Sequence, residues 1–191
     1  VCLFGMTLTA DLFLFPIMYI FGDVLTEVYG FKKARVAIWT GFAANLLMSV
    51  FIMIIITLPY PDFWPHNNAY NTVLGFTPRL VLASLIAYFI GEFSNSVVLS
   101  KLKLRMEGRY LWVRTISSSI VGQGLDTSIF MLIAFGGLYS WPIFFGMVLV
   151  QYLWKVGYEV LATPLTYYFV GWLKKKEGID TFDINVKYRP F

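Results

Sequence analysis

Long apolar runs separated by short polar turns make up most of this chain. Five of these runs are long enough to cross a bilayer as helices, which takes about 20 residues each. They do not alternate with the two-residue period of a barrel strand, so the backbone is expected to satisfy its hydrogen bonds within helices. We therefore predict an all-α fold, a polytopic membrane helix bundle. The five predicted spans cover residues of about 12–29, 36–58, 80–99, 111–135 and 141–172.

These spans predict a single transmembrane helical domain over residues 1–173, followed by a basic cytoplasmic C-terminal tail at 174–191. The last run is long for one span, so we expect tilt, a break or a kink at Pro164. Residues 59–78 are rich in turn formers and aromatic side chains, which predicts a loop outside the membrane. The chain opens on Val1 and not on Met, so we expect its own N-terminus to be missing. Five spans with the C-terminus inside place Val1 outside, so we expect a sixth helix upstream in an intact protein that begins inside.

Composition supports the membrane assignment and gives an orientation. Only 14% of the 191 residues are charged, against about 25% in soluble domains. The net charge of +4 does not indicate nucleic-acid binding, because the basic residues cluster in the turns at 30–35 and 101–109 and in the tail. Basic loops remain cytoplasmic. We therefore expect a multi-pass protein of the bacterial cytoplasmic (inner) membrane, with its C-terminus inside. We expect membrane lipid to contact its helices.

Polar residues recur inside the apolar spans in one repeated pattern. A glycine precedes a polar residue, and a second polar residue follows three positions later, at Gly22-Asp23, Gly91-Glu92 and Gly122-Gln123. The intramembrane polar set is Asp23, Glu27, Glu92, Asn95, Arg114, Gln123, Asp126, Lys155 and Glu159. Five acids face two bases, and each central charge costs about 2.5–3.5 kcal/mol on insertion scales. The set predicts either structural pairs or a polar pocket near the midplane.

Both interpretations make specific predictions. In the structural one, Lys155 pairs with Glu159 at i,i+4 on the same helix, and Arg114 pairs with Asp23 or Glu27. In the functional one, the surplus of carboxylates suits protons, a cation or a ligand rich in N–H donors. A guanine-like ring offers two adjacent N–H donors to one carboxylate and a carbonyl oxygen to an amide or lysine.

Other classes of function find little support in the residues. With one cysteine and one histidine, no internal disulfide, metal site or cofactor is expected. A membrane-embedded enzyme would need a nucleophile and a base at a catalytic spacing, and no such spacing stands out, so we expect no catalytic residue. The chain has no GxxxxGK[ST] loop, so any energy from ATP must come from another chain.

Several motifs in order resemble one known family. They are FPIMYIFGDVLTEVYG followed by KKARVAIW, then IGEFSNSVVLSKLK, GRYLWVRTISSSIVGQGLDTSIF and YLWKVGYEVLATPLTY. Together they resemble the queuosine precursor transporter family, also called the VUT family of vitamin uptake transporters, over about residues 12–173. The resemblance implies a six-helix inner-membrane importer of 7-deazaguanine precursors, namely 7-cyano-7-deazaguanine, 7-aminomethyl-7-deazaguanine or queuine. It also implies a likeness to the substrate-binding components of energy-coupling-factor vitamin transporters.

The resemblance also suggests a substrate site. The family's acidic and amide motif positions fall on Asp23, Glu27, Glu92, Asn95, Gln123 and Asp126, with Arg114, Lys155 and Glu159 alongside. We expect these residues to bind a small deazapurine substrate and no nucleic acid. An alternative is a substrate-binding subunit for another vitamin-like ligand, which needs a separate energising partner. The sequence leaves open that partner, the energy source and whether the protein is a homodimer.

Overall fold

The computed structural model describes residues 2–3, 6–7, 15–61, 63–75 and 77–190. Within these ranges the fold is a bundle of helices, which confirms the predicted fold class. The helices are α1 (Phe15–Tyr29), α2 (Phe31–Thr57), α3 (Asn67–Gly75), α4 (Thr77–Arg105), α5 (Leu111–Phe135) and α6 (Trp141–Glu177). The only strands among the described residues are β1 (Cys2–Leu3) and β2 (Met6–Thr7), which pair antiparallel. The start of the first predicted span, residues 12–14, lies outside the described residues.

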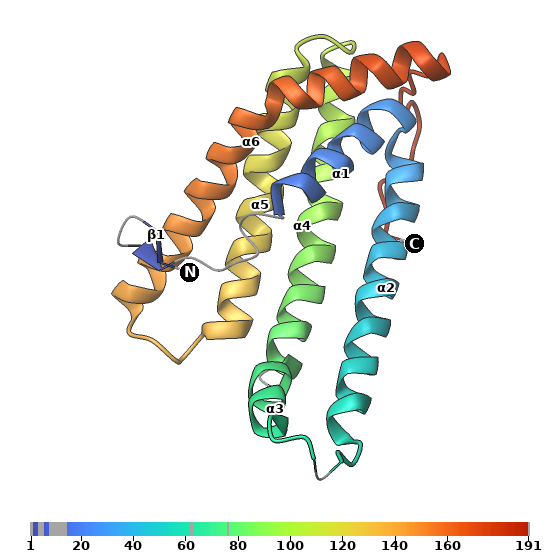
Figure 1. The fold of residues 1–191 in the computed structure, drawn as a ribbon. Helices are drawn as coiled ribbons and strands as arrows, with labels where there is room; N and C mark the ends of the chain where they lie inside the picture. Colours follow the sequence, from blue (N-terminus) through green and yellow to red (C-terminus); the bar gives the residue numbers. More distant parts are fainter. Residues whose placement is uncertain (1, 4–5, 8–14, 62, 76, 191) are drawn as a thin grey trace.

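Helices α2, α4 and α5 form the long axis of the molecule (Figure 1). Three helical stretches in the described chain are long and apolar enough to cross a membrane, namely Phe31–Thr57, Asn67–Arg105 and Leu111–Phe135. Only 6% of the most apolar stretch of α2 is buried inside the chain. Its exposed side chains include Leu47, Phe51 and Ile54. A face of this kind is stable in lipid and would aggregate in water.

Glycines bring α4 and α5 into close contact. A Cβ atom on Gly91 would lie 2.7 Å from Cβ of Asp126, and one on Gly122 would lie 2.7 Å from Cβ of Asn95. Small residues at helix crossings allow this approach, which favours packing in lipid where helices gain no hydrophobic driving force from each other. Since Glu92 and Gln123 each follow one of these glycines in the chain, the crossing also brings polar side chains together.

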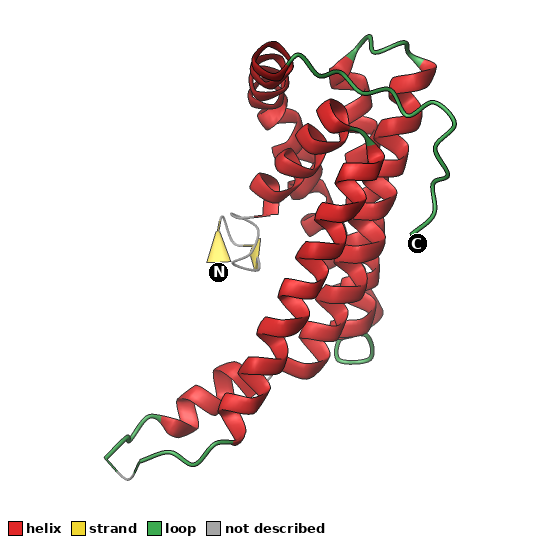
Figure 2. Ribbon diagram, turned by 90° about the vertical axis from the view of Figure 1, so that its right-hand side faces the viewer, coloured by secondary structure: helices red, strands yellow, loops and turns green. Residues whose placement is uncertain are grey.

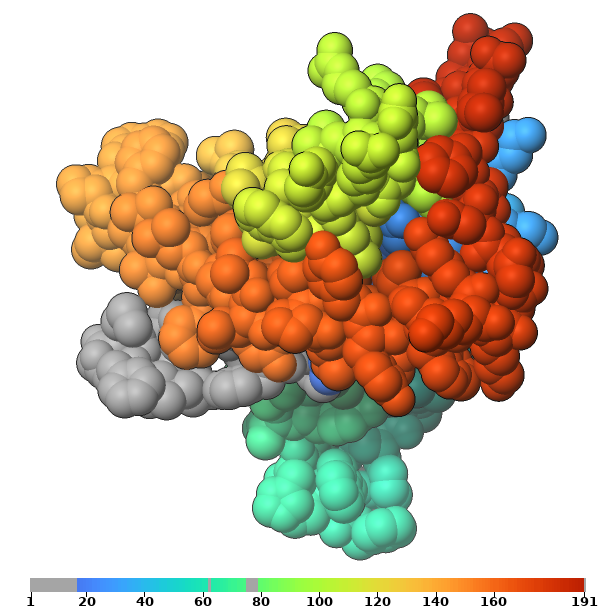
Figure 3. Space-filling model, turned by 90° about the horizontal axis from the view of Figure 1, so that it is seen from above, coloured from blue at the N-terminus to red at the C-terminus, as the bar shows by residue number. Residues whose placement is uncertain are grey.

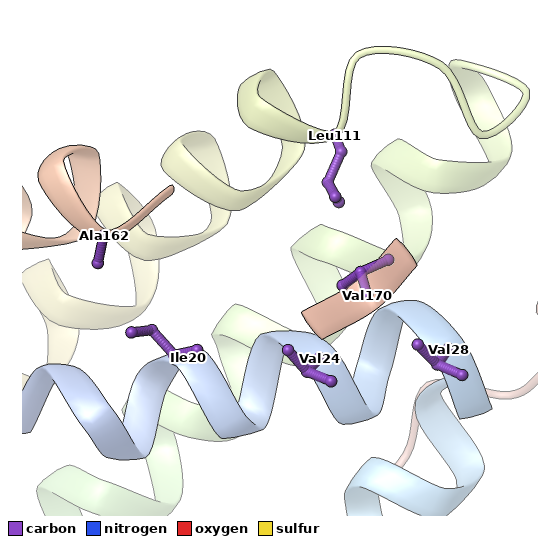
Figure 4. Close-up of a cluster of buried hydrophobic side chains, with 6 residues drawn as sticks. All are labelled: Ile20, Val24, Val28, Leu111, Ala162 and Val170. Carbon is purple, nitrogen blue, oxygen red and sulfur yellow. The ribbon is translucent and has the colours of Figure 1, made fainter. Parts of the chain in front are cut away.

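Helix α1 lies against α6 and α4, and Leu111 at the start of α5 belongs to the apolar cluster on this side (Figure 4). Its apolar contacts come from Ile20, Val24 and Val28, which are four residues apart and therefore share one face. These side chains pack with Ala162 and Val170 of α6. The neighbouring face of α1 carries Tyr19, Asp23 and Glu27 at the same spacing, and all three are buried. The packing of α1 thus turns its polar face toward the interior of the bundle.

Helix α6 is continuous from Trp141 to Glu177 and changes direction between its orange and red parts in Figure 1. It contains Pro164, which cannot donate a backbone hydrogen bond and whose ring crowds the preceding turn. The kink expected near Pro164 is therefore present and the break is not. The helix also extends past residue 172, so Lys174 belongs to its last turn and not to the tail.

Two segments predicted as irregular are more ordered than expected. The region at 59–78 carries the nine-residue helix α3, which lies at the far end of the molecule (Figure 2). The C-terminal segment returns along the bundle and does not extend away from it (Figure 2). There Trp39 donates a hydrogen bond to the carbonyl of Pro190 at 2.8 Å, and the ring of Tyr188 packs 5.1 Å from that of Phe31. The tail is part of the fold because apolar and polar contacts fix it against α2.

Candidate functional site

A cavity of about 340 Å³ lies between α1, α2, α4, α5 and α6. Its volume is at the lower end of the range for small-molecule sites, roughly 300–1,000 Å³. The lining residues are Met18, Tyr19, Asn45, Leu80, Ser84, Tyr88, Glu92, Asp126, Phe130 and Lys155. Most of this surface is apolar, and the charged side chains are those of two acids and one base. An apolar pocket with a few convergent polar groups is the usual form of a ligand site.

Glu92 occupies the centre of this arrangement. Its residue is only 6% exposed, and it lines both this cavity and a second one of about 170 Å³ between α1, α2 and α4. The carboxylate lies directly against Gly22 of α1, where any side chain would collide with it. The glycine at position 22 therefore makes room for the acid on the facing helix.

Asp126 and Lys155 form an ion pair across the cavity wall. The ammonium of Lys155 donates to the carboxylate of Asp126 at 2.8 Å, and both side chains are about 5% exposed. The pair joins α5 to α6.

A second group of polar residues is buried but does not line the cavity. The amide nitrogen of Asn95 donates to one carboxylate oxygen of Asp23 at 2.7 Å. Five side-chain oxygens of this group are buried and accept no hydrogen bond from any described residue. They belong to Asp23, Asn95, Gln123 and Glu159, the last contributing both carboxylate oxygens. This region is rich in acceptors and poor in donors.

Glu27 belongs to a different site, at the end of the bundle where the basic turns lie. It is fully buried and binds Arg114 of α5 at 2.8 Å and Lys174 of α6 at 2.8 Å. Lys103 of α4 lies 3.6 Å from the same carboxylate. We call these four residues the Glu27 cluster. The predicted pairing of Arg114 with Glu27 is confirmed, whereas Lys155 pairs with Asp126 and not with Glu159 as predicted.

The C-terminal segment completes this end of the molecule. Asp180 accepts hydrogen bonds from Lys103 and from Lys174. Partial burial opposes ionisation of Asp180, but the two ammonium groups hold the pKa of its carboxyl below the ordinary value. Asp183 accepts from the backbone N–H of Phe31 at 2.7 Å, which places a carboxylate at the N-terminus of α2. Seen from this end, α6 and the α4–α5 turn cover the bundle and leave little of α1 visible (Figure 3).

The structure thus divides the nine predicted site residues among three places. Glu92, Asp126 and Lys155 line the cavity. Asp23, Asn95, Gln123 and Glu159 are buried but are not among the cavity-lining residues, and Glu27 and Arg114 form ion pairs in the Glu27 cluster. Among the described residues, no group of three His, Cys, Asp or Glu side chains could hold a metal ion.

Sequence reasoning missed several residues of these sites. Tyr19 and Tyr88 line the cavity, and Lys103 is 2% exposed although it was assigned to a basic turn. A signal for Lys103 was present, because it follows Glu92, Ser96 and Leu99 at helical spacing on one face of α4. No comparable signal marks the two tyrosines, since aromatic side chains are abundant throughout the chain.

Comparisons with known proteins agree on a class. A sequence profile described as "Putative vitamin uptake transporter" matches residues 9–169. The chain is 30% identical to the "Probable queuosine precursor transporter" of Bacillus subtilis (strain 168), over 86% of this chain and 72% of that protein. It is 28% identical to the "Queuosine precursor transporter" of Escherichia coli (strain K12), over 71% of this chain and 58% of that protein. These names describe transporters and not enzymes. The search of solved structures found no match.

Proposed function

Because the chain belongs to the vitamin uptake transporter family, we propose that it carries queuosine precursors across a membrane. The observation that supports this most is the cavity between five helices, lined by Glu92, Asp126 and Lys155 within a mostly apolar wall. Transporter sites lie near the bilayer midplane at helix interfaces, and polar residues there mark the path of the substrate. Glu92 and Lys155 both stand near the middle of helices that are longer than the hydrocarbon core requires.

The substrates we propose are 7-cyano-7-deazaguanine, 7-aminomethyl-7-deazaguanine and queuine, which share a guanine-like edge. Glu92 would accept the two adjacent N–H donors of that edge, and Lys155 would donate to the ring carbonyl while Asp126 holds it in place. The rings of Tyr19, Tyr88 and Phe130 would contact the flat faces of the base. Hydrogen bonds to a charged group contribute about 1.5–3 kcal/mol each. This donor and acceptor pattern distinguishes a guanine-like ring from adenine-like bases.

The same proposal includes an orientation in the cytoplasmic membrane of a bacterium. The α1–α2 junction, the α4–α5 turn and the end of α6 lie at one end of the molecule (Figure 1). These segments carry most of the basic residues, and basic loops remain cytoplasmic. The C-terminus would therefore be inside. The cavity would face the opposite side, since Leu80 at the start of α4 and Phe130 near the end of α5 line it.

Uptake by the variant Glu92→Gln tests whether Glu92 binds the substrate. Glu92→Gln keeps the size of the side chain and removes the carboxylate that two N–H donors require. We expect uptake of labelled 7-cyano-7-deazaguanine by cells that lack their own importer to fall at least tenfold at equal expression. Glu107→Gln, in the exposed turn after α4, is the matched control and should leave uptake unchanged. Wild-type uptake by the Glu92 variant would remove this residue from the site.

A further inference from the structure

Two carboxylic acids on neighbouring helices are buried in the interior of the bundle. Asp23 of α1 and Glu159 of α6 are each 0% exposed. Both oxygens of Glu159 and the second oxygen of Asp23 accept no hydrogen bond from any described residue. The two carboxyl groups are close enough to repel each other when both are charged. Buried carboxylates in this situation cannot both remain ionised, because neither solvent nor a cation compensates the second charge.

The basic side chains nearby already have other partners. Lys155 lies one turn before Glu159 on α6 but is bound to Asp126. Arg114 and Lys174 are bound to Glu27, one turn beyond Asp23 on α1. Asn95 donates to Asp23 and adds no charge. The charge that would neutralise the acid pair is therefore a proton.

The acid pair also interacts electrostatically with groups that line the cavity. Asp23 and Glu159 interact electrostatically with Glu92 and with the hydroxyl of Tyr19, both of which line the cavity. A ligand that binds at Glu92 therefore changes the field at the pair, and the charge state of the pair changes the field at the ligand. The titratable groups that interact with the pair are Tyr19 and Glu27 of α1 and Glu92 of α4. The neighbouring helices α5 and α6 carry Asp126, Arg114 and Lys155, which form ion pairs. In α2 the ionisable residues are Lys32, Lys33 and Arg35, all in its first turns.

We propose that Asp23 and Glu159 form a proton-binding site that couples substrate import to a proton gradient. This inference rests on the proposed transport function and supplies its energy source. One proton from the outer solution binds the pair, crosses with the substrate and leaves to the cytoplasm, so no other co-reactant is required. The site lies where α1 packs on α6, and Glu159 is five residues before Pro164. The loss of its proton places two like charges across that helix contact. Protonation thus favours close packing of the two helices, and deprotonation favours their separation.

The test uses purified full-length protein in proteoliposomes, with the membrane potential clamped at zero. The probe is labelled 7-cyano-7-deazaguanine, which carries no net charge at neutral pH. One proton per substrate across a gradient of one pH unit supports about tenfold accumulation on the alkaline side. We expect the wild-type protein to reach this level when the outside is acidic, and to equilibrate the substrate when the gradient is collapsed.

The variant Glu159→Gln distinguishes the coupling of import to protons from the binding of substrate. Its amide cannot take up and release a proton, so we expect the variant to bind the probe within about threefold of wild type but only to equilibrate it. Asp23→Asn provides the same comparison on the other helix if the first variant does not fold, and Glu107→Gln is the exposed carboxylate control. Gradient-driven accumulation by both core variants, or wild-type uptake that ignores the gradient, would overturn the proton site and leave the transporter assignment intact. Absence of binding and uptake by folded wild-type protein would instead overturn the proposed function.

Discussion

The ion pair of Lys155 and Asp126 is the residue-level feature on which the cavity most depends. Both side chains are about 5% exposed, and their contact spans α5 and α6. Two isolated charges at this depth would be costly, whereas a pair with good geometry offsets much of that cost. The pair therefore fixes a hydrogen-bond donor at the cavity wall and stabilises the helix contact behind it.

Removing one partner of the Lys155–Asp126 pair should lower the free energy of unfolding more than replacing both partners with apolar residues. Lys155→Met removes the cation that Asp126 binds and leaves the buried carboxylate without that countercharge, so we expect the free energy of unfolding to fall by about 3–5 kcal/mol. The double variant Lys155→Met/Asp126→Leu leaves no uncompensated charge and should recover much of this loss, while uptake stays abolished. Unfolding of the purified proteins in detergent measures both effects. A double variant as unstable as the single one would show that the two charges do not offset each other's cost of burial.

The partner of Lys155 could not be predicted from the sequence. Lys155 and Glu159 are one turn apart on α6, and the spacing predicted that they would pair. On an exposed helix such a pair gains only about 0.2–0.5 kcal/mol, so a well-placed acid on a neighbouring helix competes easily. Asp126 is that acid. Which neighbour faces a buried lysine depends on helix rotation and crossing, which a single sequence does not specify.

At the level of elements, the crossing of α4 and α5 positions the polar groups. Gly91 and Gly122 face each other across the contact, and an added Cβ on Gly122 would lie 2.9 Å from the carbonyl oxygen of Gly91. The backbones can approach this closely only without side chains. Because Glu92 and Gln123 follow these glycines, the distance between the helices also sets the distance between polar side chains.

An alanine at the crossing should force the helices apart. For Gly122→Ala we expect a loss of about 1–3 kcal/mol in the free energy of unfolding, as for other overpacked contacts, together with weaker substrate binding. Gly157→Ala is the control, because a Cβ at that position meets nothing within 4 Å and alanine favours a helix. Thermal unfolding of both variants measures the difference. Equal melting temperatures would contradict the role of the crossing.

The elements themselves were largely predictable. Apolar runs of the length that a membrane requires gave the positions of α2, α4, α5 and α6, because lipid leaves the backbone few alternatives to a helix. Helix α3 was missed because a nine-residue helix in a polar region has no such requirement. The docking of the tail was missed too, since it depends on single contacts such as Asp183 with Phe31.

At the level of the whole molecule, the two ends of the bundle differ. The Glu27 cluster and the C-terminal segment connect α1, α4, α5 and α6 at the basic end. The cavity lies on the other side of this cluster. In the orientation we propose, the substrate leaves at this end, and import would have to break and remake the contacts of the cluster.

Low pH should weaken the contacts that Asp180 makes with Lys103 and Lys174 at the basic end. The pKa of Asp180 is lowered in the folded protein, so its contribution to stability is present above the ordinary carboxyl pKa, near 3.8, and is lost as the pH falls through the folded value. We expect wild-type protein to melt at a higher temperature than Asp180→Asn at pH 7, with the difference shrinking below about pH 4. The effect should be small because the Asp180 side chain is 45% exposed. A difference that stays constant down to pH 2 would exclude this carboxylate as its source.

The central claim is that the cavity at Glu92 takes a 7-deazaguanine. The most direct measurement is the binding of 7-cyano-7-deazaguanine, 7-aminomethyl-7-deazaguanine, queuine and guanine to purified protein in detergent, with wild type and Glu92→Gln side by side. We expect tight binding of at least one deazapurine, weaker binding of guanine, and a loss of affinity of at least tenfold in the variant. Folded wild-type protein that binds none of the four, or binds them equally well without the Glu92 carboxylate, would contradict it.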